Sequence, residues 1–112
     1  MKPIPAVSLD DYCSERKIRL TARDLIKIDA EGADLDVLRG AEKLICSGSP
    51  QIAVTTYHKE EHARDILAYL KSIKPAYRFR LKGLTLFGPK RFFGGAKPRP
   101  MLLQAALPDG AI

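Results

Sequence analysis

The sequence alternates short β-branched runs with helical segments, and this alternation is its strongest constraint on the fold. Leu25–Ile28 is an apolar run that stops at Asp29, and residues 33–46 then repeat apolar side chains at helical spacing. Residues 51–56 and 59–73 give the same order of strand and helix again. Strands that alternate with helices predict a parallel sheet with right-handed crossovers. The chain is therefore expected to have an α/β fold.

The two ends of this pattern are less regular. Residues 4–7 suit a short strand, which two prolines would confine to an edge. A helix is predicted to begin at Ser8, whose hydroxyl can cap the amide three residues on. Residues 77–81 and 101–105 predict two final strands without a helix between them, hence an antiparallel pair at one edge. A basic loop rich in Gly and Pro is expected between them, at about 82–99.

Length and composition indicate one soluble globular domain over residues 1–112. The chain is 46% apolar and 29% charged, and it has no apolar run near the roughly 18 residues of a membrane helix. The N-terminus lacks the apolar core of a signal peptide. Cys13 and Cys46 form neither a disulfide framework nor a metal-binding spacing. Reduced thiols and the absence of an export signal predict a cytoplasmic protein.

The net charge of +6 is unevenly distributed. Residues 1–73 are nearly neutral, whereas residues 74–108 contain eight basic side chains and no acidic one. A solvated basic edge is the simplest interpretation. A nucleic-acid-binding module is an alternative, with four phenylalanines as stacking groups, but no recognised binding motif supports it. These are Phe79, Phe87, Phe92 and Phe93.

Two turns follow predicted neighbouring strands, and ligands of open α/β sheets bind beyond such strand ends. Asp29 and Glu31 belong to the first turn, and Tyr57, His58 and Lys59 form the second. If the strands are neighbours, these groups meet at one rim, where they could accept a hydroxyl proton or bind a divalent ion. Asp29 and Glu31 could equally serve only to complement the dipole of the next helix.

Other side chains near these turns have simpler interpretations. His58 and His62 are four residues apart, but His58 precedes the predicted helix and the sequence places no third ligand, so no metal is assigned. Tyr57 suits a packing role with its hydroxyl in water. Lys27 shares a strand face with Asp29, and an ion pair with that carboxylate would explain a lysine in a buried strand.

The same segments resemble the FkbM methyltransferase domain. Residues 7–12 include its helix start, SLDD, and residues 24–41 are similar to its central pattern DxIKIDxEGxExxVLxGA. Residues 53–59 end in a YHK turn like that of some members, and residues 77–81 and 99–105 resemble the closing strands. The resemblance covers about residues 7–105, and its long central block is far more specific than a single glycine motif.

The resemblance implies a partial Rossmann-like methyltransferase fold: a mostly parallel sheet with helices on both faces and an antiparallel edge strand. It implies transfer of a methyl group from S-adenosylmethionine to a hydroxyl of a sugar, polyketide or similar small molecule. Asp29 and Glu31 would orient or deprotonate this acceptor, and His58 is the next candidate base. Tyr57 and Lys59 would contact the substrate.

The first strands of such a domain are missing from the sequence, together with the Gly-rich turn that would hold the cofactor. Gly94 and Gly95 come late and are not followed by a helix. The isolated chain is therefore expected to be inactive and to leave one sheet edge open. A truncated reading frame is favoured over an isolated piece or a subunit completed by a missing N-terminal half or a homo-oligomer. A non-catalytic structural or partner-binding remnant is the other alternative.

Overall fold

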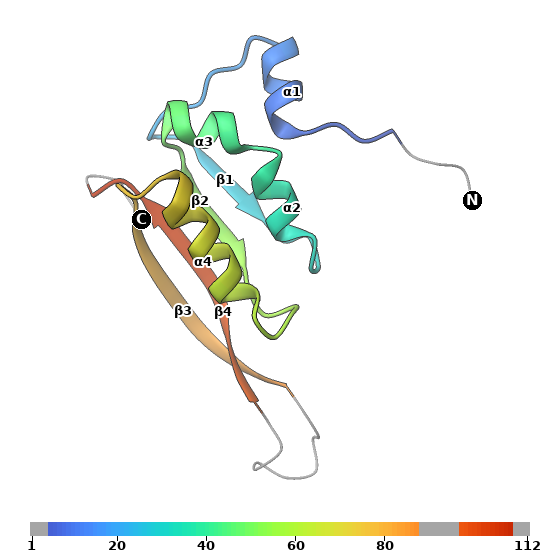
Figure 1. Ribbon diagram of the computed structural model, residues 1–112, viewed down its shortest axis with the longest axis vertical. Helices are drawn as coiled ribbons and strands as arrows, with labels where there is room; N and C mark the ends of the chain where they lie inside the picture. Colours follow the sequence, from blue (N-terminus) through green and yellow to red (C-terminus); the bar gives the residue numbers. More distant parts are fainter. Residues whose placement is uncertain (1–4, 88–96, 109–112) are drawn as a thin grey trace.

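The computed structural model describes residues 5–87 and 97–108, which form one four-stranded sheet and four helices. The strands are arranged in the order β1-β2-β4-β3 (Figure 1). The elements along the chain are α1 (Leu9–Glu15), β1 (Leu25–Ile28), α2 (Asp34–Arg39), α3 (Glu42–Gly48), β2 (Gln51–Thr55), α4 (His62–Ile73), β3 (Arg78–Phe87) and β4 (Lys97–Ala106). The predicted mixed α/β fold is confirmed.

The sheet combines one parallel and two antiparallel pairings. β1 and β2 run parallel, with Ile26 opposite Ile52. β4 runs antiparallel to both of its neighbours, so that Leu103 lies opposite Val54 on β2 and Leu81 on β3. The last two strands thus form the expected antiparallel pair at one edge. Within this pair β3 is the edge strand. β4 lies inside the sheet and runs in the direction opposite to the other three strands.

The basic segment at 82–99 differs from the predicted loop. Residues 82–87 continue β3, and residues 97–99 already belong to β4, because the ladder extends to a Phe87–Lys97 pair. Continuous pairing satisfies backbone groups that a loop would leave to water. Residues 88–96 of the predicted loop, Gly94 and Gly95 included, lie outside the described residues.

All the described helices that pack on the sheet cover the same face. Burial alternates along β1, where Ile26 and Ile28 are buried while Leu25 and Lys27 are exposed. The buried residues of the strands join residues of α2, α3 and α4 in one core. These include Ile52, Val54 and Leu103 from the sheet and Leu38, Ile45 and Ile66 from the helices. Helices were expected on both faces, but among the described residues they cover one face, and the second face is exposed or half-buried.

The helix predicted over 33–46 is divided into α2 and α3 by contacts with α1. Asp10 N donates to Gly40 O at 2.8 Å, and the Asp10 carboxylate accepts the amides of Lys43 and Leu44 at 3.0 Å each. Asp10 thus caps α3 from a distant segment. A Cβ on Gly40 would lie 3.2 Å from Ser8 Cβ, so glycine allows this close approach. The predicted Ser8 cap of α1 is confirmed, with Asp11 N donating to Ser8 Oγ at 3.1 Å.

Two further boundaries differ from the sequence predictions. α4 begins at His62 rather than at residue 59, because residues 59–61 form a turn that ends on the His62 N to Lys59 O hydrogen bond of 3.2 Å. Residues 5–7 are not a strand, and residue 4 lies outside the described part. Within residues 5–87 and 97–108, no helix has the length and apolarity needed to cross a lipid bilayer.

Candidate functional site

The turns after β1 and β2 meet at one rim of the sheet, as the sequence predicted. Asp29 follows β1 and His58 follows β2, and His58 Nε2 lies 3.1 Å from Asp29 Oδ1. Thr55, the last residue of β2, donates from Oγ1 to the same oxygen at 3.0 Å. Parallel neighbouring strands end at the same side of a sheet, which is why residues 29 apart in sequence come into contact.

The Asp29 carboxylate is held in its ionised form. Hydrogen bonds from His58 and Thr55 keep the pKa of Asp29 below its ordinary value of 3.8. An ionised carboxylate can only accept hydrogen bonds, so Nε2 of His58 carries the proton between them. In the neutral ring this leaves Nδ1 of His58 as a hydrogen-bond acceptor. The His58 side chain is 19% exposed and that of Asp29 is 54% exposed, so the pair can be reached from solvent.

The other predicted site residues surround this pair. The Tyr57 ring lies against the His58 ring, with centroids 4.1 Å apart. Lys59 reaches back to the first turn, where its Cε is 3.2 Å from the position that a Cβ on Gly32 would take. Glu31 is exposed and adopts a left-handed backbone conformation, with φ of 50°. The structure therefore brings all five predicted residues to one rim, while their chemical roles stay predictions.

A second carboxylate–histidine pair lies beneath the first and was missed as a site. Asp34 is fully buried and His62 is 4% exposed, with Asp34 Oδ2 3.0 Å from His62 Nε2. Asp34 also accepts the amides of Ala30 at 2.7 Å and Gly32 at 3.1 Å. The sequence indicates only a first-turn helix acid at Asp34 and a metal-ligand spacing at His62, so it does not predict this pair. An aspartate just after a tight turn is typical of residues that accept the turn's own amides.

The electrostatics of Asp34 are dominated by two opposing effects. Burial raises its pKa, whereas the amides of Ala30 and Gly32 and the ring of His62 lower it, and the net shift is downward. The buried carboxylate is thus ionised, and hydrogen bonds from the protein replace those that water would make to it. It fixes the turn at 30–32, on which the exposed pair depends for its position.

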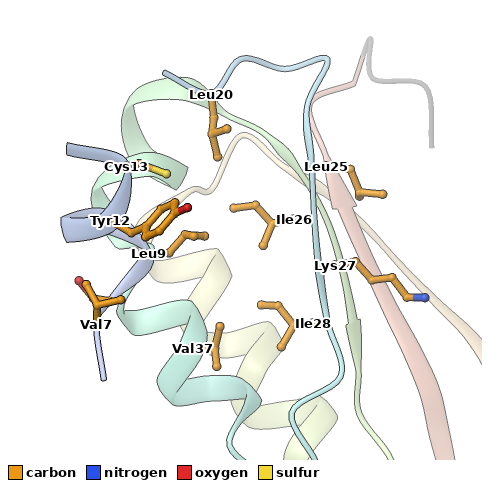
Figure 2. Close-up of a pocket in the computed structure, with 11 residues that line it drawn as sticks. Val7, Leu9, Tyr12, Cys13, Leu20, Leu25, Ile26, Lys27, Ile28 and Val37 are labelled. Carbon is orange, nitrogen blue, oxygen red and sulfur yellow. The ribbon is translucent and has the colours of Figure 1, made fainter. Parts of the chain in front are cut away.

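Lys27 does not form the predicted ion pair with Asp29. Among the described residues the hydrogen-bonded partners of Asp29 are His58 and Thr55, and Lys27 extends from the opposite side of β1 to Ile26 and Ile28 (Figure 2). The lysine sits in a strand that is buried on one face only, so its ammonium group remains in water. Its environment differs from the prediction because the sheet has an exposed face.

Arg99 is a further rim residue, although its sequence position indicates only the end of the basic segment and the start of a closing strand. It lies in β4, and its Nη1 donates to the carbonyl of Tyr57 at 3.0 Å. Thr56 strengthens the same junction by donating from Oγ1 to Pro100 O at 2.6 Å. β4 thereby fixes the second turn. No local pattern could have placed Arg99 there, because the contact follows from β4 lying beside β2.

Metal ligation is not apparent in the described part of the chain. There, no group of three or more His, Cys, Asp and Glu side chains is arranged to hold a metal ion. His58 and His62 each bind a different aspartate, so they do not act as a pair.

Comparisons with known proteins identify the family of the chain and support its fold. The model of the methyltransferase FkbM domain matches residues 2–81, which include the whole first turn and the His58 turn. The chain belongs to the FkbM methyltransferase family. Its fold is similar to the crystal structure of methyltransferase FkbM from Methylobacillus flagellatus KT, with 30% identity and a TM-score of 0.55. The match covers 80% of this chain and 21% of that one, and no curated protein matches.

FkbM methyltransferases are as a family dependent on S-adenosylmethionine, but the described residues of this chain do not form a cradle for it. The strand-to-helix turn after β1 has a single glycine, Gly32, and Lys59 occupies the space above it. Asp34 accepts the amides of Ala30 and Gly32, so these two donors are not available to a ligand. Among the described residues, the rim therefore presents acid–base groups rather than a Gly-rich turn.

Proposed function

We propose that this chain supplies the acceptor-binding side of an S-adenosylmethionine-dependent O-methyltransferase. The observation that carries the proposal is the Asp29–His58 pair, which is exposed at the strand ends with one ring nitrogen of His58 left to accept a proton. Membership of the FkbM family supports methyl transfer as the reaction. The matched chain is much longer than this one, so the proposal assigns the cofactor site to polypeptide outside these residues.

In the proposed mechanism, His58 Nδ1 removes the proton of the acceptor hydroxyl as that oxygen becomes the nucleophile. The proton passes to the imidazole, and the Asp29 carboxylate stabilises the imidazolium through its hydrogen bond to Nε2. Thr55 keeps the carboxylate in place from the other side. Asp29 thus acts by orienting the base, which assigns the proton transfer to His58.

The proposed acceptor is a hydroxyl on a sugar, a polyketide or a similar small molecule. The ring of Tyr57 beside His58 offers an apolar surface for such a molecule. Lys59 and Glu31, both exposed at the same rim, offer hydrogen bonds to its polar groups. The free thiols Cys13 and Cys46 are typical of a reducing compartment, which supports the cytoplasm as the location.

The isolated chain is proposed to be inactive, because the methyl donor is held elsewhere. A chimera tests this. Residues 5–108 would replace the matching part of the Methylobacillus flagellatus chain, and methyl transfer from labelled S-adenosylmethionine would be measured on a panel of hydroxyl compounds. We expect transfer by the chimera and none by the isolated chain. His58→Gln should lower kcat by about a hundredfold, with Arg64→Gln, an exposed change on α4, as the matched control.

Two results would contradict the proposal. A chimera that binds the cofactor but methylates nothing would favour a non-catalytic, partner-binding role. A His58→Gln chimera with unchanged kcat would show that the rim pair is not the base. Nucleic acid is disfavoured as the ligand, since Phe79 packs edge-on against Tyr77, with centroids 6.3 Å apart, and against the core.

A further inference from the structure

A line of basic side chains runs along β3 on the face of the sheet opposite to the helices. Phe79 packs against the core, and successive residues of a strand point to opposite faces. Arg78, Arg80 and Lys82 therefore share the other face, and all three are exposed. They span about 13 Å at the usual rise per residue. We call these three residues the basic stripe.

The charge of the basic stripe is not balanced by neighbouring carboxylates. Its cross-strand neighbours on β4 are uncharged, namely Ala106, Gln104 and Leu102. No acidic residue occurs between positions 74 and 108. Within residues 5–87 and 97–108, no ion pair involves the basic stripe. The stripe therefore forms a positive surface that complements an anionic one.

The basic stripe is followed by exposed apolar surface. Leu84 comes after Lys82 on the same face and is 69% exposed, more than any other large apolar side chain in the described part of the chain. Its cross-strand neighbour is Pro100, which is half-buried. β2 ends opposite Leu102, whereas the β3–β4 ladder continues, so this end projects past β2 and α4 (Figure 1). A row of cations that leads to a projecting leucine combines the two contacts, electrostatic and apolar, that hold peripheral proteins on anionic bilayers.

We propose that the basic stripe and Leu84 dock the β3–β4 pair on the surface of an anionic phospholipid bilayer. The two guanidinium groups and the ammonium group bind the phosphates and carboxylates of the lipid head groups. Leu84 enters the boundary between head groups and acyl chains. Each basic side chain close to such a surface contributes about fivefold to the affinity, so the basic stripe contributes about a hundredfold.

Two other roles explain less of this surface. Single-stranded nucleic acid binds by stacking its bases on aromatic side chains, and β3 and β4 carry no aromatic residue at the positions that share the face of the basic stripe. Basic side chains also protect an edge strand against pairing. Protection does not require them to gather on one face, and it does not account for the exposed Leu84 beside them.

The proposed docking would also bring the bilayer beside the rim. β3 runs parallel to β1 and β2, because β4 is antiparallel to both of its neighbours, so Leu84 lies toward the rim end of the sheet. Thr55, Leu102 and Lys82 form one cross-strand row, which spans about 10 Å at the usual strand spacing. If His58 is the base, the acceptor hydroxyl belongs to a lipid-anchored molecule. That extension rests on the proposed function, whereas the binding of a bilayer does not.

Co-sedimentation with vesicles tests the docking on the isolated 112-residue chain. Phosphatidylcholine vesicles that contain about one-third phosphatidylserine would be compared with vesicles of pure phosphatidylcholine. We expect the chain to sediment only with the anionic vesicles and to be released at about 1 M salt, where the Debye length is about 3 Å. The triple variant Arg78→Gln/Arg80→Gln/Lys82→Gln should bind about a hundredfold more weakly.

Arg19→Gln/Arg23→Gln/Lys43→Gln is the matched control. It removes the same number of positive charges, also from exposed positions. Two of them precede β1, and the third lies on α3, which packs on the opposite face of the sheet. This variant should bind anionic vesicles like the unmodified chain. Circular dichroism would show that both triple variants are folded.

A single tryptophan tests the contact between Leu84 and lipid, because the chain has no tryptophan of its own. The emission of Leu84→Trp should shift to shorter wavelength when anionic vesicles are added, since the indole ring leaves water for the bilayer interface. Leu81→Trp is the control for this variant. Leu81 is also exposed, at 50%, but it shares the helix-facing side of β3 with Phe79, so its emission should not change.

Four outcomes would overturn the inference. They are equal binding to both kinds of vesicle, equal losses in the two triple variants, an unchanged emission of Leu84→Trp, and tighter binding to poly-uridine RNA than to anionic vesicles at the same salt concentration. The last would assign the basic stripe to nucleic acid. Methyl transfer is not measured here, so a failed chimera together with vesicle binding would contradict only the proposed function.

Discussion

Two carboxylate–histidine pairs occupy the same rim, and their chemistry is alike while their surroundings differ. Asp29–His58 is open to solvent, and Asp34–His62 lies directly beneath it with almost no exposure. The Thr55 hydroxyl connects them, 3.0 Å from Asp29 Oδ1 and 3.4 Å from Asp34 Oδ1. The two pairs differ in role because they differ in burial. The inner pair fixes the turn, and the outer pair is the one we propose for proton transfer.

The largest expected effect is on stability, at the inner pair. Asp34→Asn replaces one of two acceptor oxygens with an NH2 group, so N–H donors face either the amide of Ala30 or that of Gly32. We expect a loss of about 3 kcal/mol in the free energy of unfolding, as for a broken buried charge network. Urea denaturation at pH 7 would measure it. The matched Asp29→Asn should change stability little, and equal losses in both variants would erase the distinction between the pairs.

The turn between the pairs should be nearly as sensitive. Gly32 has φ of 106°, and a Cβ there would lie 3.2 Å from Lys59 Cε. Gly32→Ala should cost about 2 kcal/mol through backbone strain and this contact. Adding Lys59→Ala should recover only the part due to the contact. Thermal denaturation would measure the stability of both variants. If the double variant regained all of the lost stability, the positive φ at residue 32 would not strain alanine.

Acid should weaken the fold through both pairs, by a smaller amount. The pKa values of Asp29 and Asp34 are lowered from 3.8, so both groups stabilise the fold above that pH. This stability is lost as the pH falls below 3.8 through the folded-state values. The urea midpoint should therefore drop between pH 5 and pH 3. The drop should shrink in Asp34→Asn more than in Asp29→Asn, because solvent screens the exposed group, and an unchanged drop in both would refute the assignment.

The smallest effect is a gain. Glu31 has φ of 50°, a conformation that costs a residue with a side chain about 1 kcal/mol. Glu31→Gly should stabilise the fold by about 0.5–1 kcal/mol, whereas Glu31→Ala keeps the strain and should not. If Glu31 also contacts the acceptor, the glycine chimera should be more stable and yet have a higher KM. If the thermal midpoint of Glu31→Gly did not rise, the backbone at residue 31 would not be strained.

Much of the rim followed from local sequence. Asp29, Glu31 and the turn at 57–59 were placed correctly because polar residues directly after β-branched runs mark strand ends. The buried role of Asp34 was not visible in the same way. In the sequence, an aspartate at a helix start looks the same whether its carboxylate faces water or accepts hydrogen bonds. Here it accepts them from two amides and from a histidine 28 residues away.

The sequence by itself determined the order of strands and helices, the capped start of α1 and the family, because each depends on neighbouring residues. Tertiary structure decided what depends on distant ones. Asp10 divided one predicted helix into α2 and α3, and pairing with β3 turned the basic segment at 97–99 into a strand. The exposed second face left Lys27 in water. Burial and strand neighbours are set by the whole sheet, and local patterns cannot report them.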